Sequence, residues 1–228
     1  MNMGQALQFA FDDNDWLVKL AMVALLTLAA IIFMPFVIGL IPVAILLGYS
    51  LAIINNVRDN RSPTLPAWRD YGELMTRGAS VLPAIFLYNL PLLLVGCCLW
   101  VLRASIGDNI IEGLATASSL CCLVPLLLLY TALTWPMLAV GTVKYARTGQ
   151  TKVFYEVNKL YDAVTTIGSF TIQWFLATLL VNVVLLTIQL IPVIGQIIAL
   201  MLAIPIHAHL LGQYARLVDR YDPHRTRR

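Results

Sequence analysis

Side chains that can bind a metal or carry a proton are rare in the long apolar runs of this sequence. His207 and His209 lie within one such run. An imidazole can bind a metal or relay a proton. Residues two apart on a helix, however, point about 200° away from each other, so these two cannot share an ion as an i,i+4 pair can. We therefore expect one histidine to be hydrogen-bonded within the protein and the other to lie near the membrane interface. A cofactor ligand is the minor alternative.

The four cysteines form two adjacent pairs, Cys97-Cys98 and Cys121-Cys122. Neighbouring residues diverge on a helix, and the pattern lacks the C-x-x-C spacing that is typical of zinc sites. We expect these thiols to act as small packing residues, and a disulfide between the two helices remains an alternative. The sequence thus predicts no metal site, no cofactor site and no catalytic residues.

Uncharged polar side chains occur in the apolar runs where charged ones are missing. They are Asn89, Gln173, Asn182 and Gln189. Hydrogen bonds between neighbouring helices are the usual role of such groups, and lining a substrate cavity is the alternative. No Asp or Glu falls within the predicted spans, and intramembrane carboxylates are the usual mark of ion pathways. The pattern argues against an ion-coupled transporter.

The composition indicates the elements that hold these groups. Of 228 residues, 60% are hydrophobic and 12% are charged, with a mean hydropathy of +0.81. Soluble domains carry about 25% charged residues and cannot hide so much apolar surface. These values exclude an ordinary soluble enzyme and a disulfide-rich secreted module. They predict an all-α, polytopic integral membrane protein.

Six segments are long and apolar enough to cross a bilayer, which requires roughly 20 residues. We expect one membrane domain over 1–228, with approximate spans at 17–34, 42–57, 81–102, 114–143, 167–190 and 196–211. The stretch 17–54 is too long for one helix, and Pro35, Gly39 and Pro42 predict its turn. A second apolar turn is expected at 191–195.

The basic residues predict the orientation. Of the 15 Lys and Arg residues, all but Arg103 fall on one side of a six-pass arrangement. Basic loops face the cytoplasm, so we expect both termini there. The acidic residues before the first span do not resemble the basic start of a signal peptide.

Two or three amphipathic helices are predicted at the membrane interface. Segments 66–80 and 152–164 each place apolar residues on one helical face and charges on the other. We expect Leu74 and Met75 to contact lipid, and 1–11 to form a weaker third helix. Asp13 or Asp15 suits the N-cap of the first span. Trp16, Trp68, Trp100 and Trp135 are expected to form an ordinary aromatic belt at the span ends.

The first and last hairpins hint at an internal duplication. Each turns at a Pro/Gly segment, 35–39 and 192–195, and each second helix contains Leu-Leu-Gly, at 46–48 and 210–212. The spacing from the turn glycine to Leu-Leu-Gly differs, so chance similarity remains the alternative. A true repeat would be parallel, related by an axis along the membrane normal.

Three strings resemble a known family. They are Phe9-Ala-Phe-Asp-Asp-Asn-Asp-Trp16, Leu65-Pro-Ala-Trp-Arg-Asp-Tyr-Gly-Glu-Leu74 and Ala208-His-Leu-Leu-Gly-Gln-Tyr214. With the Pro/Gly turns, they resemble the membrane-protein family filed as domain of unknown function 4013, over about residues 5–218. Arg69 departs from the acidic residue more common there. The resemblance implies a polytopic prokaryotic membrane protein and no assigned chemistry.

These observations favour a non-catalytic protein. We expect a scaffold or accessory component of a membrane complex or lipid-related process, and not an enzyme. The alternative is a permease-like transporter of a small molecule or lipid, with its path near the hairpin turns. The expected partners are the lipid bilayer, with anionic lipid at the basic face, and proteins of a membrane complex, but not nucleic acid. A polar cavity around Asn89, Asn182 and His207 would favour transport.

Overall fold

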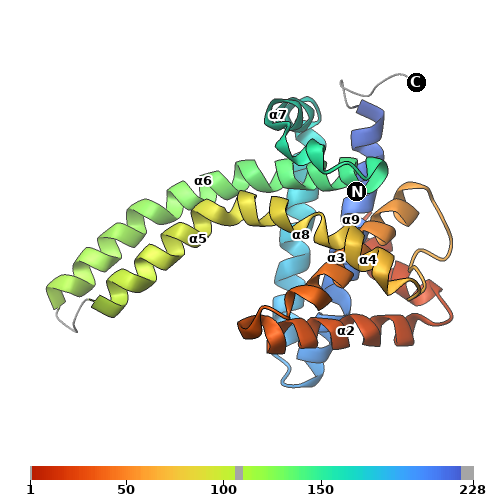
Figure 1. Ribbon diagram of the computed structural model, residues 1–228, viewed down its shortest axis with the longest axis horizontal. Helices are drawn as coiled ribbons and strands as arrows, with labels where there is room; N and C mark the ends of the chain where they lie inside the picture. Colours follow the sequence, from red (N-terminus) through yellow and green to blue (C-terminus); the bar gives the residue numbers. More distant parts are fainter. Residues whose placement is uncertain (1, 106–109, 222–228) are drawn as a thin grey trace.

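The computed structural model describes residues 2–105 and 110–221, and within them the side chains of 3, 102–105 and 110–122 are left aside. This part of the chain is helical and contains no strand (Figure 1). The elements in chain order are α1 (Met3–Gln8), η1 (Phe9–Asp12), α2 (Trp16–Phe33), η2 (Met34–Phe36), α3 (Leu40–Arg58), α4 (Tyr71–Ala79), α5 (Leu82–Ser105), α6 (Ile110–Thr148), η3 (Thr151–Tyr155), α7 (Val157–Thr166), α8 (Gly168–Gln189) and α9 (Ile194–Tyr221).

Six of these helices are long and apolar enough to span a membrane, which confirms the predicted all-α, multi-pass architecture. The predicted spans correspond to α2, α3, α5, α6, α8 and α9. Two helices extend further than the apolar runs indicated, because α6 continues to Thr148 and α9 to Tyr221. Beyond Leu211, α9 still buries Gly212, Tyr214, Ala215 and Val218. Packing against protein, rather than lipid, therefore stabilises its last turns.

The turns of the first and last hairpins share an unusual backbone conformation. Val37 has a φ of 62° and Val193 a φ of 66°, in the left-handed region that β-branched residues rarely adopt. Each valine precedes an Ile-Gly pair that leads into the next helix. A Cβ on Gly39 would lie 2.5 Å from the nitrogen of Met34, and one on Gly195 would lie 1.9 Å from the carbonyl oxygen of Ile188. This likeness of the turns supports the duplication hypothesis.

The two Leu-Leu-Gly strings, in contrast, have different surroundings. Gly48 lies against α4, where an added Cβ would be 2.0 Å from the carbonyl oxygen of Leu74. Gly212 lies against α3, where an added Cβ would be 2.6 Å from Cβ of Val57. The two glycines therefore serve different contacts, and this part of the sequence similarity has no structural counterpart.

Helix α4 is shorter than the predicted 66–80 and packs more closely on the protein than we expected. Residues 66–70 are not helical, and Asp70 has a φ of 54°. The α4 backbone lies directly on α3, because a Cβ on Gly78 would be 1.8 Å from the carbonyl oxygen of Ala44. Of the two residues that we expected to contact lipid, Met75 is exposed, whereas Leu74 is partly buried.

Helix α7 begins at Val157, after the short helix η3, and not at residue 152. It buries Leu160 and Ala163 and leaves Val157 and Tyr161 exposed. The N-terminal segment forms α1 and η1, with Ala6, Phe9 and Ala10 buried in the main hydrophobic core. It is therefore part of the packed structure rather than a loosely attached interfacial helix.

The α5–α6 hairpin extends away from the other helices (Figure 1). Half of the residues in the most apolar stretch of α3 are buried, against 6% in the span that contains α5. Exposed apolar side chains on the hairpin include Phe86, Leu94, Trp100, Leu126 and Leu129. The hairpin joins the packed part of the protein through its ends near Val81 and Tyr145, which are both buried.

Candidate functional site

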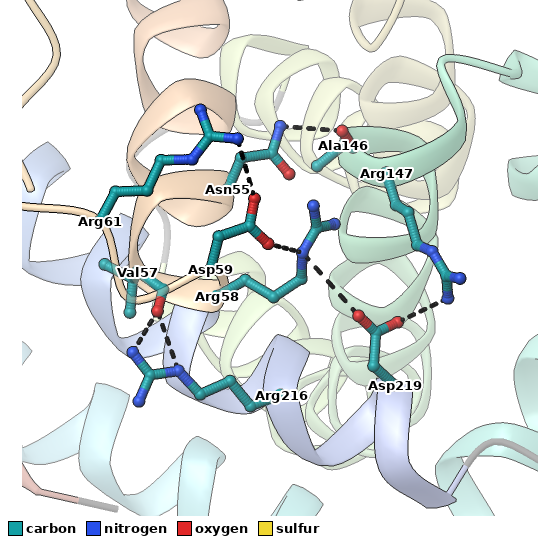
Figure 2. A network of polar contacts seen from close by, with 9 residues as sticks. All are labelled: Asn55, Val57, Arg58, Asp59, Arg61, Ala146, Arg147, Arg216 and Asp219. Carbon is teal, nitrogen blue, oxygen red and sulfur yellow. Dashed lines mark hydrogen bonds and ion pairs between the residues drawn. The ribbon is translucent and has the colours of Figure 1, made fainter.

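The ends of α3, α6 and α9 are joined by a set of polar contacts that we call the basic-face network (Figure 2). The Arg216 guanidinium on α9 donates from Nε to the carbonyl oxygen of Val57, at 2.8 Å, and its Nη2 donates to the same oxygen. That carbonyl belongs to the last turn of α3, where carbonyl oxygens have no partner within the helix, and it also accepts from the backbone nitrogen of Asn60 at 3.2 Å. Arg216 therefore closes the end of one helix with a side chain from another.

Asp219 on α9 contacts both α6 and α3. Its Oδ1 accepts a hydrogen bond from Nη1 of Arg147 on α6, at 3.1 Å. Its Oδ2 lies 3.8 Å from Nε of Arg58 on α3. The amide nitrogen of Asn55 also donates to the carbonyl oxygen of Ala146, at 2.9 Å. The network thus connects one helix from each of the three membrane hairpins (Figure 2).

A second polar cluster, the N-terminal junction, contains Asp13, Lys19, Tyr49, Leu65 and Trp68. The Lys19 ammonium lies 2.5 Å from Oδ2 of Asp13 and donates to the carbonyl oxygen of Leu65 at 3.0 Å. Lys19 and Asp13 are both buried. Trp68 donates from its indole nitrogen to the carbonyl oxygen of Lys19, at 3.1 Å, and its ring stacks on Tyr49 with centroids 4.0 Å apart.

The environment of Asp13 favours its charged form. Burial by itself raises the pKa of Asp13, but the hydrogen bond from Lys19, the backbone hydrogen bond from Asp15 and the charge of Lys19 together lower the pKa below its ordinary value. Asp15 occupies the N-cap position of α2, as expected, yet its side chain makes no capping hydrogen bond. The predicted capping role is therefore wrong for its carboxylate, and that of Asp13 pairs with Lys19 instead.

The N-terminal segment also contacts α9. The backbone nitrogen of Asn2 donates to the side chain of Gln213, at 2.8 Å. Phe9 stacks on His209 with ring centroids 4.3 Å apart, and the Gln213 amide donates to Nδ1 of His209 at 3.2 Å. The N-terminal segment therefore contacts the string at 208–214 directly, and it is linked to the string at 65–74 through Lys19.

Two cavities lie among the helices, and both are open at the protein surface rather than enclosed. The first has a volume of about 330 Å³ and is lined by α3, α5, α6 and α9, with Ser50, Thr142 and His207 as its polar side chains. The second has a volume of about 470 Å³ and is lined by α2, α3 and α9, with Thr27 and Ser50 as its polar side chains. Leu47, Ser50 and Ile204 line both, so the two cavities adjoin. Their walls are otherwise apolar.

The structure places the predicted polar residues outside these cavities. The Asn89 amide donates to the carbonyl oxygen of Ile85 at 2.8 Å, and that of Asn182 to the carbonyl oxygen of Thr178 at 2.9 Å. Both bonds lie within a single helix. Gln173 and Gln189 are exposed. The expected hydrogen bonds between helices are therefore wrong for Asn89 and Asn182, because each amide reaches a carbonyl one turn earlier in its own helix.

The histidines occupy different sites, in agreement with their spacing. His209 is buried against Phe9, whereas His207 lines the first cavity and bonds through Nδ1 to the carbonyl oxygen of Ala203 at 2.7 Å. Cys97 and Cys98 are free and exposed, while the side chains of Cys121 and Cys122 lie outside the described ones. In the described part of the chain, no three His, Cys, Asp or Glu side chains form a group that could hold a metal ion.

The sequence reasoning missed the residues that join the helices. Lys19 was used only to predict orientation, and Trp68 only as part of an aromatic belt. A lone lysine just inside an apolar span, with three aspartates before it, is a signal that could have indicated the Asp13–Lys19 pair. Arg216 and Asp219 carried no such signal, since their partners lie 159 and 72 residues away along the chain.

Comparison with known families gives one match. The family model described as Protein of unknown function (DUF4013) matches residues 28–204, which is most of the chain, although less than the 5–218 expected. The string 65–74 and both hairpin turns fall inside this range, while the other two strings lie outside it. Comparisons with curated proteins and with solved structures find no match.

Proposed function

We propose that this chain, which belongs to the DUF4013 family, is a non-catalytic scaffold or accessory component of a membrane complex or lipid-related process. It is inserted in the prokaryotic cell membrane with both termini and the basic face in the cytoplasm. Its expected contacts are with membrane proteins and with anionic lipid at that face.

The observation that carries this proposal is the basic-face network. Transporters that alternate between two open states rock one helical repeat against another around a fixed site. Here Asp219 and Arg216 connect α9 to α3 and α6, and the N-terminal junction connects α2 to the segment before α4. Opening this side would break several part-buried polar contacts together. Such a connection suits a fixed framework better than a moving gate.

The α5–α6 hairpin provides the surface for assembly. It extends away from the network (Figure 1). Its described side chains include many exposed apolar ones, among them Phe86, Leu94 and Leu126. In lipid, helices associate through close packing rather than through removal of water, so a partner helix can replace lipid on this surface at little cost.

A bridge across the network tests scaffold against transporter. In a variant without the four native cysteines, Arg147→Cys and Asp219→Cys would be joined by a short bifunctional thiol reagent, with the unbridged double variant as the control. A scaffold keeps its co-purifying proteins, identified by mass spectrometry after mild-detergent purification, with or without the bridge. Solute movement by the purified protein in liposomes that stops on bridging would overturn the scaffold proposal.

A second test compares two kinds of substitution. Replacing both Trp68 and Leu74 by Asp puts charge into the Tyr49 stack and the α3–α4 contact, so it should destabilise the protein or release its partners. His207→Gln keeps a hydrogen-bond acceptor and should leave both abundance and partners unchanged. Solute movement by the purified protein in liposomes that His207→Gln abolishes would instead contradict the scaffold proposal.

The orientation has its own test. Single cysteines at Ser62 and Gln150, in the variant without native cysteines, should react with an impermeant maleimide only from the cytoplasm. A cysteine at Asn109, which lies outside the described residues, should react only from the other side. Labelling of the Gln150 position from outside would reject the six-pass orientation.

A further inference from the structure

The polar side chains of the two cavities share one hydrogen-bonding pattern. Thr27, Ser50 and Thr142 each donate their hydroxyl proton to the carbonyl oxygen four residues earlier, at 2.7, 2.9 and 2.8 Å. Each donor is therefore occupied within its own helix. What each hydroxyl still offers is the lone pairs of its oxygen, which accept hydrogen bonds.

His207 completes this pattern in the first cavity. Its Nδ1 lies 2.7 Å from the carbonyl oxygen of Ala203, and a carbonyl oxygen can only accept, so Nδ1 carries the proton. When the ring is neutral, Nε2 is therefore an acceptor, and the hydrogen bonds of the described side chains include none to Nε2. With His207 neutral, the polar side chains of both cavities thus offer acceptors, and each of their donors is already hydrogen-bonded within its own helix.

This pattern selects the chemistry of a ligand. Carboxylates and phosphates need donors, which the cavity side chains do not supply. A purely apolar molecule would leave the acceptors without a partner, at a cost in an apolar site. A molecule with an apolar body and a hydroxyl group satisfies both the walls and the acceptors.

We propose that the adjoining cavities bind an uncharged lipid with a free hydroxyl group, and that this hydroxyl donates to His207 Nε2 or Ser50 Oγ. Ser50 lines both cavities, so the hydroxyl sits where they meet and the apolar chain extends along α3 and α9. Volumes of about 330 and 470 Å³ fall within the range of small-molecule sites. This site is separate from the proposed scaffold role, since a scaffold needs no bound ligand.

Photolabelling of the purified full-length protein in phosphatidylcholine nanodiscs tests the proposal. The probe is hexadecanol with a diazirine in its chain, and the matched probes are its methyl ether and the corresponding fatty acid. Mass spectrometry would give the ratio of adducts on Leu47 and Ile204, inside the cavities, to adducts on Leu179 and Leu186, which face outward. The internal ratio corrects for the different partitioning of the probes into the bilayer.

We expect the alcohol to give about a tenfold higher ratio than the methyl ether, as one hydrogen bond worth about 1.4 kcal/mol would produce. His207→Phe should lower the alcohol ratio about tenfold toward that of the ether. Equal ratios for alcohol and ether would overturn the proposal, and so would a higher ratio for the fatty acid, because a carboxylate needs donors.

Conservative variants keep the test decisive if His207→Phe fails to fold. Ser50→Ala combined with Thr142→Val removes two acceptors with little change in volume, and it should also reduce the alcohol ratio. Thr187→Val is the matched control, because Thr187 makes the same bond to its own helix but is exposed outside the cavities. An unchanged ratio in the Ser50 and Thr142 variant would contradict the proposed site.

Discussion

Two regions of the protein are built from apolar helices but are stabilised differently. One is the α5–α6 hairpin. The other, which we call the packed region, consists of the N-terminal junction together with α3, α4 and α9. In the packed region, buried glycines bring helix backbones together, and polar side chains bridge elements far apart in sequence. Among the described side chains of the hairpin at 82–101 and 123–135, in contrast, Ala84 alone is buried. Apolar composition therefore does not distinguish protein contact from lipid contact, because a leucine suits either environment.

The energetic consequence concerns single substitutions. In the packed region a side chain has specific protein neighbours, and its loss leaves a cavity or an unpaired charge. On the hairpin, lipid can fill the space that a smaller side chain leaves. Matched substitutions in the two regions should therefore differ in their effect on the free energy of unfolding.

The largest effect is expected from Lys19→Met. It leaves the buried Asp13 carboxylate without its cation, which should cost about 3–5 kcal/mol of stability. Unfolding in sodium dodecyl sulfate would measure this loss. Arg77→Met is the control, because the Arg77–Glu73 pair is exposed and such pairs contribute about 1 kcal/mol or less. Equal losses in the two variants would show that the Asp13–Lys19 pair is not a structural link.

Replacing a large apolar side chain by alanine in each region tests whether the two regions are packed differently. Ile53 on α3 is fully buried, whereas Leu94 on α5 is 57% exposed. Ile53→Ala should lower the free energy of unfolding by about 2–5 kcal/mol, and Leu94→Ala should change it far less because lipid replaces the lost contacts. A cost for Leu94→Ala as large as that for Ile53→Ala would indicate that the hairpin is packed against protein.

Two glycine-to-alanine substitutions should change the free energy of unfolding by smaller amounts and in opposite directions. Gly78→Ala places a methyl group against the backbone of α3 and should cost about 1–3 kcal/mol. Gly96→Ala on α5 meets nothing within 4 Å and should stabilise its helix by up to about 1 kcal/mol. Thermal denaturation followed by size-exclusion chromatography in mild detergent would measure both. Destabilisation by Gly96→Ala would reveal an unseen neighbour of the hairpin.

The smallest change in stability is expected when the pH is lowered. The pKa of Asp13 is below its ordinary value of 3.8 in the folded protein, so its stabilising contribution is complete above that value and is lost as the pH falls through the lowered one. Below about pH 4, wild type should therefore lose more stability than Asp13→Asn, which has no carboxylate to protonate. Parallel melting temperatures for the two proteins down to the acid transition would contradict this linkage.

The arrangement of the candidate site followed from the sequence only in part. A serine or threonine inside a helix commonly donates to the carbonyl one turn earlier, so the bonds of Thr27, Ser50 and Thr142 are local and could have been expected. That Ser50 and Thr142 line the same cavity depends on how α3 and α6 cross. Asn89 and Asn182 also bond to a carbonyl oxygen one turn earlier in their own helices. For these two residues, this local bond takes the place of the expected bond between helices.

The sequence by itself determined the class, the number of spans and the turns of this protein. Those features depend on residue type and spacing alone, because a bilayer requires about 20 apolar residues for each span and prolines and glycines interrupt helices. The tertiary structure decided which apolar faces meet protein and which polar side chains meet each other. Lys19 bonds to Leu65, Arg216 bonds to Val57 and His207 lines a cavity. Close helix contacts at Gly48, Gly78 and Gly212 accompany these arrangements. Such contacts join residues far apart along the chain, so no local pattern encodes them.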